Sequence, residues 1–166
     1  MSEDSRGFLM LVADGVGALA QAAEGSEEAV HTVARYLLGM GEICLETHPD
    51  RSDEIVERLR TAMMSAHSSL LAMGDETGSG TAATTLTMAF AVWPRMFLIH
   101  AGDSRYYRLR GGKLTRHTTD QTLAQVMIDS GAMSRESAEA SRLKNVLVSA
   151  VGSAQLDPEE QARALL

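Results

Sequence analysis

The spacing of hydrophobic and polar positions changes along the chain and divides it into strand-like and helix-like stretches. Residues 8–13 are six consecutive apolar side chains, and the run stops at the dipeptide Asp14-Gly15. A short apolar run that ends in a turn dipeptide predicts a buried strand rather than a helix. We therefore expect the chain to open with a strand that has an acidic residue directly after it.

Two amphipathic helices are predicted next. Ser26 has the features of an N-cap, and apolar residues at helical spacing continue the helix to about Leu45. Ser52 begins a second helix, and Gly74 stands where a left-handed C-terminal residue is expected. One stripe of the second helix is apolar and consists of Ile55, Leu59, Ala62, Met63, Ala66, Leu70 and Met73. The stripe predicts the side of this helix that faces the core.

A period of two then replaces the helical spacing. Residues 81–93 alternate large with small side chains, which predicts a strand packed on both faces. Residues 96–101 predict another strand, and residues 106–109 and 113–117 predict two more that are joined by a pair of glycines. Strands that follow one another through short turns predict an antiparallel sheet.

The last third of the chain returns to helical spacing. Helices are predicted at 123–131 and 134–141, and a short strand or buried turn at 146–151. Asp157 begins a pattern of cap, first-turn proline and third-position glutamate that predicts the start of another helix. Because the sequence stops soon afterwards, at Leu166, we expect a continuation that is missing here.

The composition narrows the class of protein. A chain of 166 residues that is 45% hydrophobic can form one domain with a real core. The net charge of −7 gives no electrostatic reason to bind nucleic acid. No apolar run reaches the roughly 18 residues that a membrane span needs, and the N-terminus lacks the parts of a signal peptide. The single cysteine, Cys44, forms no internal disulfide, so we expect a cytoplasmic protein.

Few side chains carry a chemical signal on their own. His100 lies in an apolar stretch and is expected to be a hydrogen-bonded core residue, and Ser104 lacks the flanking glycines of a serine-hydrolase elbow. Asp14 and Asp103 differ, because each directly follows an apolar strand and stands beside a glycine. Carboxylate oxygens held in this way, with backbone carbonyls nearby, are the ligands that Mg²⁺ and Mn²⁺ prefer.

Four motifs in a fixed order make the pattern specific. They are Leu-Val-Ala-Asp-Gly-Val-Gly at 11–17, Gly-Thr-Ala-Ala-Thr-Thr at 80–85, His-Ala-Gly-Asp-Ser-Arg-Tyr-Tyr-Arg-Leu-Arg at 100–110 and Leu-Thr-Arg-His-Thr-Thr-Asp-Gln-Thr at 114–122. In this order, and from about Phe8 to Gly152, the chain resembles the bacterial branch of the metal-dependent PPM (PP2C-type) serine/threonine protein phosphatases.

The resemblance implies an α+β fold, an α-β-β-α sandwich of antiparallel sheets flanked by helices. It implies that Asp14 bridges two Mn²⁺ or Mg²⁺ ions and that Gly15 adds a backbone carbonyl ligand. Asp103 is implied as a ligand of a third, weaker ion, whereas Arg105 and Asp120 match positions that we expect to be structural. The implied reaction is hydrolysis of phosphoserine or phosphothreonine on proteins by a metal-activated water.

The chain also departs from the family pattern, so that residues 1–166 resemble a truncated single domain. The strand that precedes the Asp-Gly strand in the family is missing, and so are the later SDG and DN motifs with their two metal-binding aspartates. Ser2-Glu3-Asp4 resembles the acidic pair that the missing strand carries in the family, and Asp4 is either a ligand or part of a solvated terminus. Ala18 replaces the second glycine of the family's DGxGG motif.

Two functions therefore stay open. The chain is a phosphatase that is weak or inactive on its own, or it is a non-catalytic descendant that binds phosphoproteins or another partner. The missing segments would leave strand edges exposed, and an exposed edge favours pairing with another chain. We therefore expect a homodimer or a complementing chain, and we expect neither nucleic acid nor a membrane as partner.

Overall fold

The computed structural model describes residues 7–17, 19–39, 52–77, 82–92, 95–157 and 159–164. Its elements in chain order are β1 (Gly7–Val16), α1 (Leu19–Gly39), α2 (Ser52–Thr77), β2 (Ala83–Val92), β3 (Arg95–Ala101), β4 (Tyr107–Arg110), β5 (Lys113–Arg116), α3 (Leu123–Asp129), α4 (Arg135–Ala140), the 3-10 turn η2 (Arg142–Asn145) and β6 (Glu159–Ala164). The fold is α+β with antiparallel sheets, as the sequence predicts. Among the described helices, none combines the length and the apolar character that a membrane span requires.

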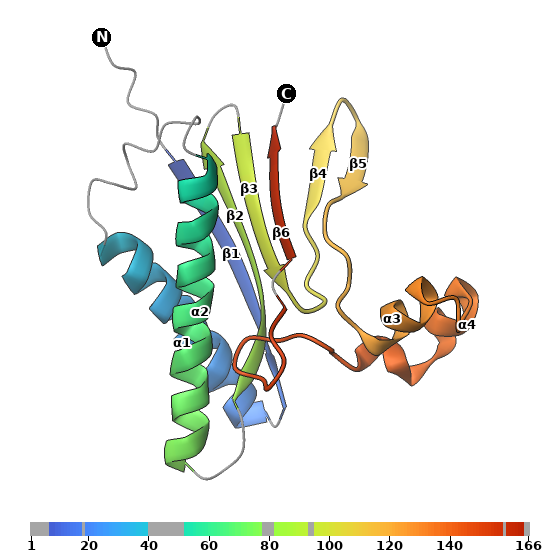
Figure 1. Ribbon diagram of the computed structural model, residues 1–166, viewed down its shortest axis with the longest axis horizontal. Coiled ribbons are helices and arrows are strands. Elements are labelled where there is room, and N and C mark those ends of the chain that lie inside the picture. Colours follow the sequence, from blue (N-terminus) through green and yellow to red (C-terminus); the bar gives the residue numbers. More distant parts are fainter. Residues whose placement is uncertain are drawn as a thin grey trace.

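A four-stranded antiparallel sheet with the order β1-β2-β3-β6 forms the body of the structure. α1 and α2 lie side by side on one face of this sheet (Figure 1). β4 and β5 form a separate two-stranded hairpin, and α3 and α4 lie at the end where the chain leaves β3 and enters β6 (Figure 1). The described part of the chain therefore has one complete layer of helices on one sheet.

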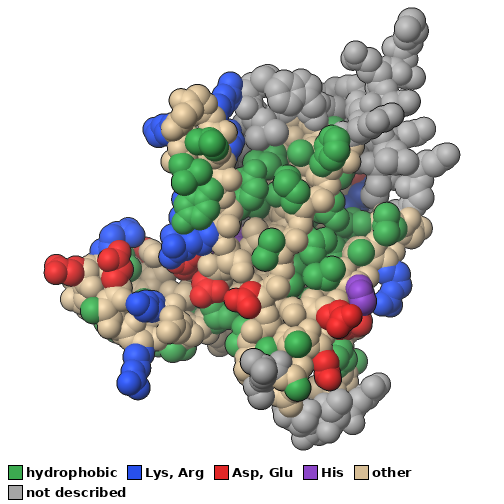
Figure 2. Space-filling model, turned by 180° about the vertical axis from the view of Figure 1, so that it is seen from behind, with side chains coloured by type: hydrophobic (Ala, Val, Ile, Leu, Met, Phe, Trp, Pro, Cys, Tyr) green, Lys and Arg blue, Asp and Glu red, His purple; other side chains and the backbone are tan. Residues whose placement is uncertain are grey.

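β1 is the predicted first strand, and it differs from the prediction in two ways. It continues through Asp14 and Gly15, which pair with Thr85 and Thr84 of β2, so the dipeptide lies in the strand and is not a turn. Its side chains alternate between the two faces, and the outward set is exposed, with Phe8 at 68%. The strand is buried on one face only, because no described helix covers the face of β1 that carries Phe8. On the same side of β2 and β3, Tyr106 packs against Ala89, Met96 and Leu98. Figure 2 shows this side of the molecule.

The first helix begins earlier than the sequence predicts. α1 starts at Leu19, so Ser26 lies inside the helix and the N-cap prediction is wrong. The Ser26 hydroxyl donates instead to the carbonyl oxygen of Ala23, at 3.0 Å. The alanine-rich residues before Ser26 favour the helix more strongly than a single cap signal opposes it. The predicted end near Leu45 lies outside the described residues.

The second helix is confirmed from Ser52 onward and supplies much of the core. It continues through Gly74 to Thr77, so the predicted end at Gly74 is wrong. Its apolar stripe is buried at Ile55, Leu59, Ala62, Met63, Ala66 and Leu70. The stripe packs against the helix-facing side chains of β2 and β3, which are Leu86, Met88, Phe97 and Ile99. The predicted packing of the central strand on both faces is confirmed by its burial from residue 83 to 89.

The hairpin and the small helices are also confirmed. Gly111 and Gly112 form the turn between β4 and β5 with φ values of +55° and +74°. Thr122 and Ser134 are the N-caps of α3 and α4, and each side chain accepts a backbone N–H of the first turn. Residues 146–151 contribute two isolated bridges, so the alternative of a short strand or buried turn resolves to a bridged turn.

The end of the chain is a strand, and the predicted helix after Asp157 is wrong. β6 pairs antiparallel with β3, from His100 opposite Glu159 to Arg95 opposite Ala164. Without β6, the buried strand β3 would present a row of unpaired backbone groups. The pairing with β3 therefore outweighs the local capping pattern, which acts over one turn only.

Candidate metal site

Asp14 lies near the end of β1, and its backbone is held by the neighbouring strand. Its N–H donates to Oγ1 of Thr85 at 3.2 Å, and the two residues stand opposite each other in the ladder. The alternation of β1 places the Asp14 side chain on the exposed face, together with Val12 and Val16. A carboxylate on a paired strand has a fixed backbone and a side chain open to a ligand.

Gly15 is required by close packing, not by an unusual backbone angle. A Cβ at this position would lie 1.8 Å from the carbonyl oxygen of Ala22, in the first turns of α1. Only a residue without a side chain allows α1 to approach β1 so closely. The glycine that the family resemblance assigns as a carbonyl ligand therefore also fixes the junction of strand and helix.

Asp103 lies in the turn that follows β3. Gly102, directly before it, has a φ of +109°, and its N–H donates to Oε1 of Gln121 at 2.8 Å. A Cβ on Gly102 would lie 2.6 Å from Cγ2 of Thr85. The turn is therefore pressed against β2, and it brings Asp103 to the same end of the sheet as Asp14.

A cleft of about 690 Å³ brings the three predicted site residues together. Asp14, Gly15 and Asp103 all line it, along with Thr85. Another wall of the cleft is formed by the segment Ser149–Gln155. Val151 in this segment forms two backbone hydrogen bonds of 2.9 Å with Thr84 of β2. No sequence pattern alone singled out this wall, although its small and polar residues around Gly152 are typical of a loop that lines a site.

The electrostatics of the cleft favour a cation. Burial raises the pKa of the Asp103 carboxyl, and the negative charges of Asp120 and Asp14 raise it further. A carboxylate that is disfavoured by like charges is stabilised when a divalent cation binds beside it. The two carboxylates and the backbone carbonyl offer only oxygen donors, which are the ligands that Mg²⁺ and Mn²⁺ prefer.

The number of donors is small. Among the residues that the structure describes, no group of three or more His, Cys, Asp or Glu side chains could hold a metal ion. Asp14 and Asp103 are thus the two carboxylates of the cleft, and Asp4 lies outside the described residues. The site can accept a hard cation, and solvent must complete the coordination that these residues begin.

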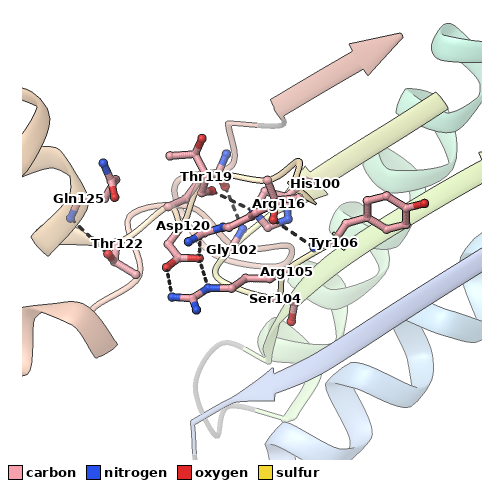
Figure 3. A network of polar contacts seen from close by, with 12 residues as sticks. His100, Gly102, Ser104, Arg105, Tyr106, Arg116, Thr119, Asp120, Thr122 and Gln125 are labelled. Carbon is pink, nitrogen blue, oxygen red and sulfur yellow. Dashed lines mark hydrogen bonds and ion pairs between the residues drawn. The ribbon is translucent and has the colours of Figure 1, made fainter. Parts of the chain in front are cut away.

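Arg105 and Asp120 form an ion pair beside the cleft, in agreement with a structural role. Nε and Nη2 of Arg105 donate to the two oxygens of Asp120 at 3.0 and 2.6 Å. Arg116 of β5 donates to the same carboxylate, so both guanidinium groups converge on it (Figure 3). The pair raises the pKa of Arg105, and it joins the turn after β3 to the segment that leads into α3.

His100 is a buried core histidine, as the sequence analysis expects. It is 1% exposed, and its Nδ1 lies 2.9 Å from Oγ1 of Thr87. Its Nε2 lies 3.1 Å from the carbonyl oxygen of Thr119 (Figure 3). Both ring nitrogens are engaged within the fold, and His100 does not line the cleft.

The comparison with protein families gives one match over most of the chain. The family model described as protein phosphatase 2C matches residues 1–152. Among curated proteins, the serine/threonine protein phosphatase PstP of Mycobacterium tuberculosis is 27% identical over 154 residues, which are 90% of this chain and 27% of PstP. Protein phosphatase PhpP of Streptococcus pneumoniae is 24% identical over 144 residues, 87% of this chain and 56% of PhpP.

Solved structures with the same fold also extend beyond this chain. The serine/threonine phosphatase PstP/Ppp of M. tuberculosis has a TM-score of 0.78 at 26% identity, and the match covers 94% of this chain and 63% of that one. PppA of Pseudomonas aeruginosa has a TM-score of 0.74 at 28% identity, with coverage of 95% and 61%. A structure of the PstP catalytic domain in complex with two manganese ions matches with a TM-score of 0.74 at 24% identity, with coverage of 99% and 67%. The chain spans 27% and 56% of the two curated relatives.

Proposed function

Because the chain belongs to the bacterial PPM branch of the protein phosphatase 2C family, we propose that it acts in the hydrolysis of phosphoserine and phosphothreonine on proteins. The observation that carries the proposal is the cleft in which Asp14, Gly15 and Asp103 meet. Elements far apart in the sequence, β1 and the turn after β3, build this cleft, and its carboxylates repel each other in the absence of a cation. Phosphorylated proteins are the proposed substrates.

We propose Mn²⁺ or Mg²⁺ as the cofactor, in line with the two manganese ions in the structure of the PstP catalytic domain. Asp14 would be a ligand of two ions, Gly15 would add its carbonyl oxygen, and Asp103 would hold a third ion more weakly. When bound, such ions supply Lewis-acid activation of a water and neutralise the phosphoryl oxygens. They also reverse the local field of a protein whose net charge is −7.

The chain's own residues have defined tasks in this proposal. Asp14 would contact both ions, and the paired backbone of β1 holds it in position. Gly15 keeps α1 close to β1. The Arg105–Asp120 pair fixes the turn that carries Asp103. None of these residues forms a covalent bond to the phosphoryl group.

A second function is favoured by the small donor set. Two carboxylates and one carbonyl offset little of the charge of two or three divalent ions, so we expect weak metal binding and weak turnover from this chain alone. A chain without turnover would bind phosphoproteins or a partner through the same cleft. This alternative and the catalytic one differ in turnover, which a direct assay measures.

The experiment is Mn²⁺-dependent hydrolysis of a phosphothreonine peptide by the purified chain. We expect slow turnover that requires Mn²⁺ and is lost in Asp14→Asn. Asp53→Asn is the matched control, because Asp53 is an exposed aspartate in the first turn of α2 and does not line the cleft. Turnover that survives in Asp14→Asn would contradict the proposed site. No turnover from a folded chain would favour the binding function.

We also propose a partner for the face of the sheet that α1 and α2 leave uncovered, which we call the bare face and which carries Phe8, Met10 and Val12 of β1. Figure 2 shows hydrophobic side chains gathered over this face. The exposed large apolar residues of β1, β4 and β5 include Phe8, Met10, Val12, Leu109 and Leu114. An apolar surface of this kind is typical of an interface, and β1 is also an outer strand of the described sheet. A second copy of this chain or a complementing chain would cover it.

Light scattering over a range of protein concentrations tests this partner. A dimer that dissociates in the variant Val12→Asp would support pairing through the bare face, since a charge there opposes burial. The same substitution at Val126, an exposed valine of α3, is the control. A monomer at every concentration would favour the complementing chain over the homodimer, and a dimer that Val12→Asp leaves intact would contradict this interface.

We propose that the described elements are part of one PP2C-like domain that acts in the cytoplasm. The extensive pairing of β1, β2, β3 and β6 in a single sheet supports one domain. A single cysteine in the sequence supports a reducing compartment. Fractionation of cells that express the full-length protein checks the compartment.

A further inference from the structure

We propose that Thr85 is a positioning residue that fixes the separation of Asp14 and Asp103. The proposal rests on the proposed function, because it takes these two carboxylates as the ligands of the bound cations. It adds a residue that belongs to neither ligand segment. Thr85 lies on β2, between the strand that carries Asp14 and the turn that carries Asp103.

The first contact of Thr85 is with the Asp14 strand. The N–H of Asp14 donates to Thr85 Oγ1 at 3.2 Å. The contact is made by the side chain of Thr85, in addition to the strand pairing that places the two residues opposite each other. The hydroxyl therefore fixes the backbone N–H adjacent to the Cα from which the Asp14 side chain projects.

The second contact is with the turn on either side of Asp103. Thr85 Oγ1 lies 2.7 Å from Oγ of Ser104, which follows Asp103. The methyl group of Thr85 packs on Gly102, which precedes Asp103, so closely that a Cβ on Gly102 would lie 2.6 Å from it. Hydroxyl and methyl thus hold the residues before and after Asp103 at the same time.

The chemistry of threonine explains why both contacts need this residue type. One hydroxyl has two lone pairs and one hydrogen, so it can accept the Asp14 N–H and still bond the Ser104 hydroxyl. Thr85 is 1% exposed, so water cannot replace these bonds. Valine has nearly the same shape but lacks the hydroxyl, and serine has the hydroxyl but lacks the methyl group.

The contacts matter because the two carboxylates repel each other. Asp14 and Asp103 line the same cleft, so their like charges oppose each other across it. In the absence of a cation this repulsion favours a wider site. Thr85 links both segments to one side chain and opposes the widening, so less rearrangement is needed when a cation binds. Substitutions of residues that orient metal ligands commonly lower metal affinity by about 10- to 100-fold.

The test is Mn²⁺ affinity measured by titration calorimetry of the folded, purified chain. We expect Thr85→Val to weaken Mn²⁺ binding by about tenfold and Thr85→Ser to weaken it less. Thr84→Val is the matched control, because it removes a buried hydroxyl from the same strand on the face that is turned away from the cleft. We expect Thr84→Val to lower the melting temperature without changing the affinity.

Two results would overturn the proposal. One is a Thr85→Val protein that is folded and binds Mn²⁺ as tightly as the unsubstituted chain. The other is an equal loss of affinity in Thr84→Val, which would mean that any buried hydroxyl of β2 has this effect. A merely structural role for Thr85 would lower the melting temperature of both variants and leave the affinity of both unchanged.

A second readout separates this proposal from the proposed function. If Asp14→Asn binds Mn²⁺ as well as the unsubstituted chain, or if neither binds it, the proposed function is wrong. The positioning role is then decided by amide hydrogen exchange of the metal-free chain. We expect Thr85→Val to speed exchange at Asp14 by about fivefold, as the loss of one hydrogen bond does, and Thr84→Val to leave it unchanged. Unchanged protection at Asp14 in Thr85→Val would overturn the proposal.

Discussion

The two faces of the four-stranded sheet differ in how deeply their side chains are buried. The face under α1 and α2 is filled by side chains such as Leu86 and Met88, which are fully buried. The opposite face leaves Met10 and Val12 half exposed or more, and at its end it carries Asp14 beside the cleft. In a two-layer arrangement, burial on one face is enough to fold the chain. The other face is then free to bind cations, substrate or another chain.

The largest expected effect is a difference in the free energy of unfolding between one methionine-to-alanine substitution under the helices and another on the bare face. Met63→Ala removes a fully buried side chain from the helix-covered core, whereas Met10→Ala removes one that is 49% exposed on β1. We expect Met63→Ala to lower the free energy of unfolding by about 3 kcal/mol and Met10→Ala by about 0.5 kcal/mol. Urea denaturation measures both. Equal losses at a protein concentration at which the chain is monomeric would contradict the comparison, because no partner then covers Met10.

A substitution at the junction of the two layers should have the next largest effect. Gly15→Ala would place a Cβ 1.8 Å from a backbone oxygen of α1, and backbone cannot move aside as a flexible side chain can. We expect a loss of about 2 kcal/mol in the free energy of unfolding and a weaker affinity for Mn²⁺. The control is Gly39→Ala at the exposed end of α1, where no atom lies within 4 Å of the added Cβ. An unchanged stability in Gly15→Ala would mean that α1 does not approach β1 so closely.

The smallest expected effect concerns the charge of the cleft. The pKa of Asp103 is raised in the folded chain, so the folded state prefers the protonated carboxyl more than the unfolded state does. The negative charge of Asp103 therefore destabilises the metal-free fold at neutral pH. This loss of stability develops as the pH rises from the pKa of Asp103 in the unfolded state through its higher pKa in the folded state. We expect Asp103→Asn to raise the melting temperature at pH 7 by about 2 °C, after allowance for partial solvent screening.

The pH series supplies the control for this effect. At a pH below the unfolded pKa both forms are neutral, so the difference between Asp103→Asn and the unsubstituted chain should vanish. Saturation with Mn²⁺ at pH 7 should reverse the difference, since the cation stabilises the carboxylate and not the amide. A melting temperature that falls in metal-free Asp103→Asn at pH 7 would contradict the unfavourable charge.

The elements that the sequence predicts well are those with a strong local pattern. The stripe of α2 and the alternation of β2 follow from periods of 3.6 and 2, and the glycine pair fixes the turn of the hairpin. The capping signals at Ser26 and Asp157 gave wrong predictions. Each signal spans one turn only and competes with interactions that act over a longer stretch of the chain. An alanine-rich segment extends α1 in the first case, and the free edge of β3 recruits β6 in the second.

The candidate site was predictable only in part. Asp14 and Asp103 stood out because each followed an apolar run and matched a family motif. Their meeting in one cleft, the wall at Ser149–Gln155 and the contacts of Thr85 depend on how distant segments pack, which no local pattern encodes. The residue type at Thr85 gave a hint, since a threonine on the small-residue side of a central strand carries a hydroxyl into a buried position.

The proposed function requires that cations bind at the Asp14 end of the bare face. The most direct test is the paramagnetic effect of Mn²⁺ on the amide NMR signals of the chain, added in small amounts to the metal-free protein. We expect selective broadening of Asp14, Gly15, Asp103 and the wall at Ser149–Gln155. Signals of the helix-covered core at the other end of the sheet, such as that of Ile55, should stay sharp. Broadening that is uniform over the acidic surface, or that is centred away from Asp14 and Asp103, would contradict it.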